Sequence, residues 1–211
     1  MQLSHCLHDS VLLMTIPEAI AVVTGVLSVW YARKESILVY PIGIISVLLY
    51  VYICLQVKLY ADAAVNFYYF LASVYGWYFW LKGGRNQAES RGEEKAHIAT
   101  FNMPKQIGFA LLTLLGGFVI GYLLDTYTDS NVPYWDGITT AIFCSAMWLM
   151  ARKQIENWVY WIIGDIICVP LFFSKGLCLS SLQYLIFTML AVAGWITWNH
   201  RLKKRQEEQH A

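Results

Sequence analysis

Seven long apolar stretches, separated by short polar segments, make up most of this chain. A helix needs about 20 apolar residues to cross the hydrocarbon core of a bilayer, with a range of about 17–25. Each stretch comes close to that length. The pattern therefore predicts seven transmembrane helices, at residues 11–31, 37–56, 60–81, 107–124, 134–151, 155–173 and 179–198.

Composition favours the same class of protein. The 211 residues are 58% hydrophobic and 14% charged, whereas soluble domains are about 45–50% apolar and about 25% charged. We predict an all-α integral membrane protein in which residues 1–211 form a single transmembrane domain in contact with lipid. The net charge of only +1 suggests no nucleic-acid partner.

Two short motifs occur in both halves of the chain. Gly76-Trp77-x-x-Trp80 returns as Gly194-Trp195-x-x-Trp198, and Ala32-Arg33-Lys34 returns as Ala151-Arg152-Lys153. The spacings are 118 and 119 residues. They predict two three-helix repeats, at about 11–81 and 134–198, in a three-one-three plan with a linker helix at 107–124. Repeats of this kind, parallel in the membrane, are known from transporters.

Lysine and arginine predict the orientation, because they are enriched in cytoplasmic loops. All of the 15 basic residues except Lys58 and Lys175 fall on one side of the predicted bundle. We therefore expect the N-terminus outside, and the charged tail at 199–211 in the cytoplasm. The polar segment at 83–105 is expected to be a flexible cytoplasmic linker.

The sixth stretch carries the most distinctive polar residues. Asn157, Trp161 and Asp165 follow one another at intervals of four, and Trp158 shares their broad helix face. A carboxylate at this depth is costly without a partner or water. Two indoles beside it would suit a flat cationic ring. Alternatively, Trp158 anchors the membrane interface and Asp165 pairs with a hydroxyl of a neighbouring helix.

The first and third stretches offer further candidates. Asn66 and Tyr69 lie on one face of the third stretch, and Asn66 is expected at about the depth of Asp165. An amide can donate to and accept from a hydroxylated or amide-bearing ligand. Glu18 could line the same cavity, pair with Lys58 or Lys175, or hold the bundle together, and its position favours a structural role.

Several classes of protein are disfavoured by missing motifs. The chain contains no GxxxxGK[ST] loop, which argues against an ATP-driven pump, and no H-E-x-x-H or G-x-S-x-G motif. The five cysteines include no CxxC pair, and the histidines fall outside the predicted spans. We therefore predict no enzyme activity, no cofactor and no metal site.

Four segments resemble the Pnu-type vitamin transporter family. The strongest resemblance is in the segment R-K-Q-I-E-N-W-V-Y-W at 152–161. The segments L-Y-A at 59–61, Y-G-W-Y-x-W at 75–80 and P-Y-W-D at 133–136 support it in order and spacing. The resemblance covers the chain from about residue 18 to 198. It implies a fold similar to that of the SWEET sugar transporters, and assembly as a trimer.

The resemblance also implies a function. Members of the family take up nicotinamide riboside across the bacterial inner membrane by facilitated diffusion, and phosphorylation in the cytoplasm traps the vitamin. Two positions depart from that pattern: Asn66 stands where glutamine is usual, and Asp165 where asparagine is usual. A thiamine transporter, a proton-coupled version and, less well matched, a riboflavin transporter therefore remain alternatives.

Overall fold

Seven long helices make up most of the described part of the chain, which comprises residues 16–56, 58–88, 97–174 and 178–210 of a computed structural model. Each predicted stretch contains one helix, which confirms the all-helical class; residues 11–15 of the first stretch lie outside the described residues. The helices are α2 (Ile16–Arg33), α3 (Val39–Gln56), α4 (Tyr60–Ala88), α5 (Met103–Tyr127), α6 (Pro133–Ala151), α7 (Asn157–Ser174) and α8 (Cys178–His210).

The apolar surface of the bundle suits a membrane. Helices α3, α5, α7 and α8 have the length and mean hydropathy to cross a bilayer. Only 17–28% of the residues in their apolar segments are buried inside the protein. Most of these apolar side chains therefore face outward, where lipid rather than water accommodates them.

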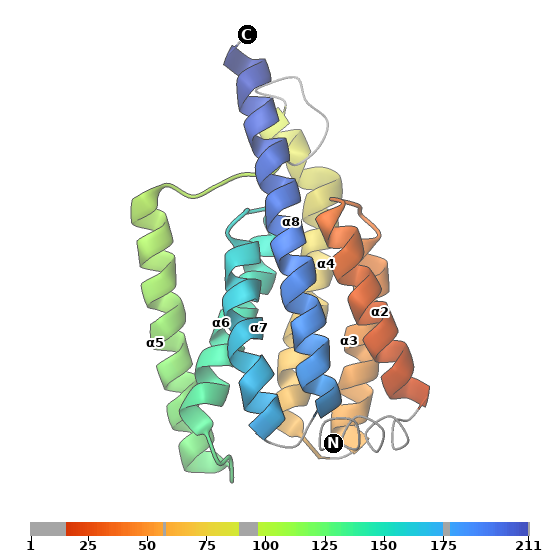
Figure 1. The fold of residues 1–211 in the computed structure, drawn as a ribbon, viewed down its shortest axis with the longest axis vertical. Helices are drawn as coiled ribbons and strands as arrows, with labels where there is room; N and C mark the ends of the chain where they lie inside the picture. Colours follow the sequence, from red (N-terminus) through yellow and green to blue (C-terminus); the bar gives the residue numbers. More distant parts are fainter. Residues whose placement is uncertain (1–15, 57, 89–96, 175–177, 211) are drawn as a thin grey trace.

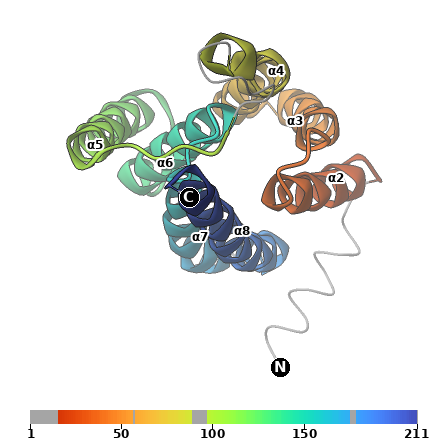
Figure 2. The ribbon, with the colours of Figure 1, turned by 90° about the horizontal axis from the view of Figure 1, so that it is seen from above.

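Six of the helices form a ring, and the seventh lies outside it (Figure 2). Along the ring, contacts run from α2 to α3 and α4, and then to α6, α7 and α8, which returns to α2. Helix α5 packs mainly on α6, and its Phe109 also meets the ring of Tyr160 in α7 (centroids 5.8 Å apart). The halves of the ring, α2–α4 and α6–α8, therefore meet at two seams, α4 with α6 and α2 with α8.

Close packing between α5 and α6 depends on glycine. A Cβ at Gly117 would approach the backbone of Ile138 to 2.9 Å, and one at Gly121 would come within 2.8 Å of the Tyr134 ring. Gly137 faces the backbone of Gly121 from the other helix. Small residues allow membrane helices to approach this closely, and this explains how α5 is held beside the ring.

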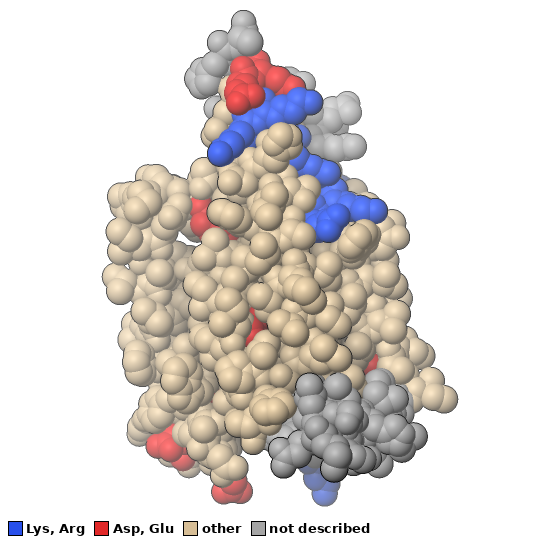
Figure 3. Space-filling view, viewed as in Figure 1, with Lys and Arg blue, Asp and Glu red and all other residues tan. Residues whose placement is uncertain are grey.

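Lysine and arginine concentrate at one end of the bundle. In the face seen in Figure 3, they gather along the C-terminal part of α8 and beside it, above a wide band in which only small acidic patches reach the surface. We call this the basic end; α2 and α6 end there, and α3 and α7 begin there (Figure 1). Acidic residues do not follow this division, because they are visible beside the basic residues as well as at the opposite end (Figure 3).

Two segments at the basic end differ from the expected arrangement. Helix α8 continues through the predicted charged tail to His210. Residues 83–88 of the expected linker are helical, 89–96 lie outside the described residues, and 97–101 pair with the loop between α6 and α7. In that pairing, the amide of Ala99 donates to the carbonyl of Lys153 (3.0 Å) and the amide of Ile155 to the carbonyl of Ala99 (2.9 Å).

Candidate functional site

Asp165 is the buried carboxylate around which the candidate site is built. It lies two turns into α7, and only 2% of its surface is exposed. In the part of the chain that the structure describes, the carboxylate makes no hydrogen bond or ion pair. A charge buried without a partner costs several kcal/mol. An ionisable residue in a transmembrane segment is therefore a functional candidate.

A stack of three aromatic rings lies beside this part of α7. Trp161 stacks on Phe143 of α6 (ring centroids 5.5 Å apart, planes at 29°), and Phe143 stacks on Tyr184 of α8 (6.0 Å, 9°). The ring of Phe143 also packs directly against Gly164, where any side chain would collide with it. Three helices of one half thus contribute rings to the neighbourhood of a buried carboxylate.

Tyr184 connects this stack to the other half of the ring. Its hydroxyl is close enough for electrostatic interaction with Asp165, and with Tyr50 and Asp62 of the first half. Tyr69 of α4 interacts in the same way with Tyr184. Two predicted residues, Tyr69 of the first half and Asp165 of the second, therefore both lie within electrostatic range of Tyr184.

The remaining candidates of the first half lie at different distances from this centre. Glu18 interacts electrostatically with Tyr50, which also bonds to Gln183. The half-buried Asn66 donates from Nδ2 to the carbonyl of Asp62 in its own helix, at 2.9 Å. Glu18 therefore reaches the site through Tyr50, and the amide of Asn66 has a backbone partner within α4.

Two predicted residues of α7 lie at the basic end rather than beside Asp165. Trp158 is 1% exposed and sits edge-on to Trp198, with centroids 5.5 Å apart. Asn157 is fully buried and donates from Nδ2 to the carbonyl of Gln154, at 2.6 Å. The structure thus places Trp158 in a hydrophobic cluster and gives Asn157 a role in the turn before α7.

Phe143 and Tyr184 were not identified by sequence reasoning. Aromatic residues in an apolar span carry no signal that separates packing from ligand contact. One indication was available for Tyr184, because it follows Asn66 by the repeat spacing of 118 residues. A repeat position that holds an amide in one half and a phenol in the other is a place where the halves differ chemically.

Charged side chains also join the halves at the basic end. Lys153 Nζ lies 2.8 Å from Glu35 Oε1, and Arg201 Nη1 lies 3.1 Å from Glu35 Oε2. Burial alone would raise the pKa of Glu35, but the two cations outweigh it and hold this pKa below its ordinary value. Beside them is a surface hollow of about 330 Å³, lined by Glu35, Arg201, Lys204, Arg205 and Glu208.

A helical ring with an outward apolar surface and a buried carboxylate in one of its helices is the architecture of a multi-pass membrane protein, and the family to which the chain belongs makes it a transporter. The chain belongs to the nicotinamide mononucleotide transporter family, whose sequence model matches residues 15–200. This confirms the family indicated by the sequence motifs.

Individual relatives agree with that assignment. The nicotinamide riboside transporter PnuC of Escherichia coli K12 is 29% identical over 212 residues, which cover 89% of this chain and 87% of the relative. The riboflavin/roseoflavin transporter RibM of Streptomyces davaonensis is 27% identical over 127 residues, covering 60% of this chain and 58% of that protein. A crystal structure of the vitamin B3 transporter PnuC superposes with a TM-score of 0.71 and 26% identity, covering 97% of this chain and 89% of that one.

Proposed function

We propose that this protein takes up nicotinamide riboside by facilitated diffusion, and that phosphorylation in the cytoplasm then traps the vitamin. The observation that carries the proposal is the buried Asp165 beside the rings of Trp161, Phe143 and Tyr184. Nicotinamide riboside carries a flat pyridinium cation. A carboxylate can pair with that charge, and cation–π contact adds about 0.5–2 kcal/mol.

The remaining candidate residues have supporting roles in this proposal. Tyr69 and Glu18 would line the polar side of the site, where ribose hydroxyls need hydrogen-bond partners. Asn66 would join them when its amide leaves the carbonyl of Asp62. Asn157 and Trp158 would act at the edge of the site, toward the basic end.

We further propose that the basic end faces the cytoplasm and that three copies assemble. The concentration of lysine and arginine at that end supports the orientation, because basic residues are retained on the cytoplasmic side. It would place the C-terminal end of α8 inside the cell and the N-terminus outside. The trimer rests on the family resemblance alone.

Riboflavin and thiamine are the alternative substrates. The similarity to a riboflavin/roseoflavin transporter favours riboflavin, whereas the buried carboxylate favours the cationic thiamine. A proton-coupled version would use Asp165 or Glu18 as the titrating group. An unpaired carboxylate next to aromatic rings matches a cation better than the neutral riboflavin.

Uptake of the three labelled vitamins into proteoliposomes tests the proposal. We expect nicotinamide riboside to equilibrate across the membrane at a rate that an imposed proton gradient does not change. Asp165→Asn should slow this uptake, and the matched control Asp136→Asn, which changes a carboxylate bonded to Ser130 at the other end of the bundle, should not. Faster uptake of riboflavin or thiamine, or accumulation driven by protons, would refute the proposed function.

A further inference from the structure

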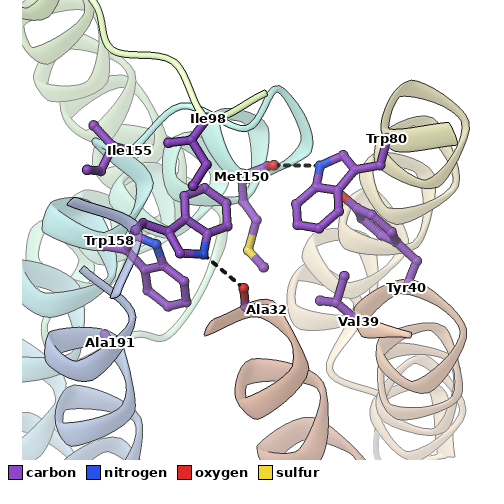
Figure 4. Packing of buried hydrophobic residues seen from close by; sticks show 10 residues of the cluster. Ala32, Val39, Tyr40, Trp80, Ile98, Met150, Ile155, Trp158 and Ala191 are labelled. Carbon is purple, nitrogen blue, oxygen red and sulfur yellow. Dashed lines mark hydrogen bonds between the residues drawn. The ribbon is translucent and has the colours of Figure 1, made fainter. Parts of the chain in front are cut away.

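At the basic end, one tryptophan from each half of the ring donates a hydrogen bond to the backbone of the other half. Trp80 Nε1 of α4 donates to the carbonyl of Met150 in α6 (3.2 Å), and Trp198 Nε1 of α8 donates to the carbonyl of Ala32 in α2 (3.1 Å) (Figure 4). The two indole rings also meet, with centroids 6.0 Å apart. Each of the two seams between the halves is therefore crossed by one of these two indole hydrogen bonds.

The surroundings of the two tryptophans are alike. Trp80 meets the ring of Tyr40 edge-on (5.2 Å, 89°), and Trp198 meets the ring of Trp158 edge-on (5.5 Å, 88°). Trp198 follows Trp80 by 118 residues, and Trp158 follows Tyr40 by the same number. The same arrangement is thus built twice, once from each half.

Glycine and the loop geometry extend the correspondence. Tyr40 packs against Gly76, and Trp158 against Gly194, 118 residues later. Glu35 and Lys153, again 118 residues apart, both have a positive φ, of 59° and 53°. Structurally equivalent residues of the two halves are therefore 118 residues apart. The A-R-K motifs are spaced by 119 residues, so they are shifted by one residue from the equivalent positions.

Opposite charges occupy the corresponding positions Glu35 and Lys153. Because the halves face each other, these two side chains form an ion pair with 14% and 7% of their side-chain surface exposed. Lys153 Nζ also lies 4.4 Å from the centre of the Trp80 ring. Arg201 Nη1 lies 3.1 Å from the other oxygen of Glu35, so this buried pair is the centre of a small charge cluster, and reversing one of its charges replaces an attraction between the halves by a repulsion.

From this arrangement we propose that the two indole hydrogen bonds and the Glu35–Lys153 pair form a gate at the basic end, closed in this structure. We call these four side chains the clasp. The proposal rests on the proposed transport function. At 1.5 Å per residue along α7, Asp165 lies about 10 Å from Trp158, and Trp161 packs against the hydrophobic cluster that contains the two tryptophans of the clasp. A solute bound at Asp165 can leave through the basic end only when the clasp separates.

Chemical labelling of Cys168 provides the test. Cys168 is 2% exposed and interacts electrostatically with Tyr69 and Tyr184, so its thiol reports access to the site. In a variant that keeps Cys168 as its one cysteine, a membrane-impermeant thiol reagent is applied to one face of oriented vesicles at a time. We expect this starting variant to be labelled slowly when the reagent is applied from the basic end.

Lys153→Glu places two carboxylates together and should open the clasp. We expect the labelling rate from the basic end to rise about tenfold, as the open population grows. The swap variant Glu35→Lys/Lys153→Glu also carries Arg201→Gln, because Arg201 Nη1 lies 3.1 Å from Glu35 Oε2 and would repel a lysine there. It restores opposite charges and should return the rate to within about threefold of the starting value. Lys204→Glu is the matched control, because the exposed Lys204–Glu208 pair lies outside the clasp, and it should leave the rate unchanged.

Trp198→Phe provides an independent variant if Lys153→Glu does not fold. It keeps an aromatic ring and removes the donor to Ala32, and it too should raise labelling from the basic end. The gate is refuted if both variants label as slowly as the starting protein, if the swap labels as fast as Lys153→Glu, or if labelling rises equally from both faces. The labelling rates are measured without any vitamin. A failure of nicotinamide riboside uptake would therefore refute the proposed substrate, but it would not change the labelling result on which the gate depends.

Discussion

Gly194→Ala should destabilise the protein by tightening the contact between α8 and α7. An added Cβ would lie 2.6 Å from the outer edge of the Trp158 ring, where ordinary contact begins at 3.4 Å. The ring is 1% exposed and rests on Trp198, so it cannot recede freely. Overpacking of this kind costs about 1–3 kcal/mol, and alanine recovers about 1 kcal/mol of helix propensity. We expect a net loss of up to about 2 kcal/mol.

Gly116→Ala is the matched control with the opposite sign. It makes the same change inside helix α5, where an added Cβ meets no atom within 4 Å. The gain in helix propensity should therefore stabilise the protein by about 0.5–1 kcal/mol. For a chain of about this size, 1 kcal/mol corresponds to about 2–4 °C in Tm. Thermal unfolding in detergent should thus show a decrease for Gly194→Ala and an increase for Gly116→Ala.

A double-mutant cycle with Trp158→Phe tests the cause of the decrease. The atoms nearest to the added Cβ belong to the six-membered ring of the indole at its far edge, which phenylalanine does not reach. In the Trp158→Phe background, Gly194→Ala should lose most of its penalty. The reasoning is refuted if the two effects simply add, or if Gly194→Ala and Gly116→Ala shift Tm in the same direction.

Three further predictions concern other parts of the structure. The pKa of Glu35 is below its ordinary value of 4.5 in the folded protein, so the stability that its charge contributes is complete above pH 4.5 and is lost as the pH falls through the folded pKa. When Tm is measured against pH, the Tm of the wild type should therefore fall more steeply in acid than that of Glu35→Gln. Glu156→Ala removes the acceptor that Oε1 presents to the Phe101 amide at 2.7 Å, so hydrogen exchange at residues 97–101 should accelerate by about tenfold, and unchanged exchange would contradict this. Trp161→Ala should weaken nicotinamide riboside binding in calorimetry by about tenfold through loss of cation–π contact, while Trp148→Ala, in a ring stack on Tyr75, should not.

The helices could be predicted because lipid imposes a simple rule of length and hydropathy. Their ends could not be predicted as well. Helix α8 runs beyond the apolar segment to His210, in a region whose charges include the Lys204–Glu208 pair one turn apart. Hydropathy measures transfer into lipid, and it carries no information about how far a helix continues into water.

Part of the candidate site could be inferred from Asp165 alone, since a carboxylate in an apolar span needs an explanation. Its surroundings could not, because they depend on which helices meet. Helical spacing places Trp158 and Asp165 on one broad face, yet the structure packs Trp158 against Trp198 and surrounds Asp165 with residues of other helices. Phe143 and Tyr184 come from α6 and α8, which precede and follow α7 in the chain and pack on it, but the sequence does not show which faces of these helices meet.

A comparison of two forms of one ligand tests the central claim most directly. Nicotinamide riboside and its reduced dihydro form have nearly the same shape, but the reduced ring carries no positive charge. In calorimetry, the wild type should bind the cation at least about tenfold more tightly, because truncating one side of a buried charge pair costs about 2–5 kcal/mol. Asp165→Asn should remove most of that preference. Equal binding of both forms by the wild type, or a preference unchanged in Asp165→Asn, would contradict the account.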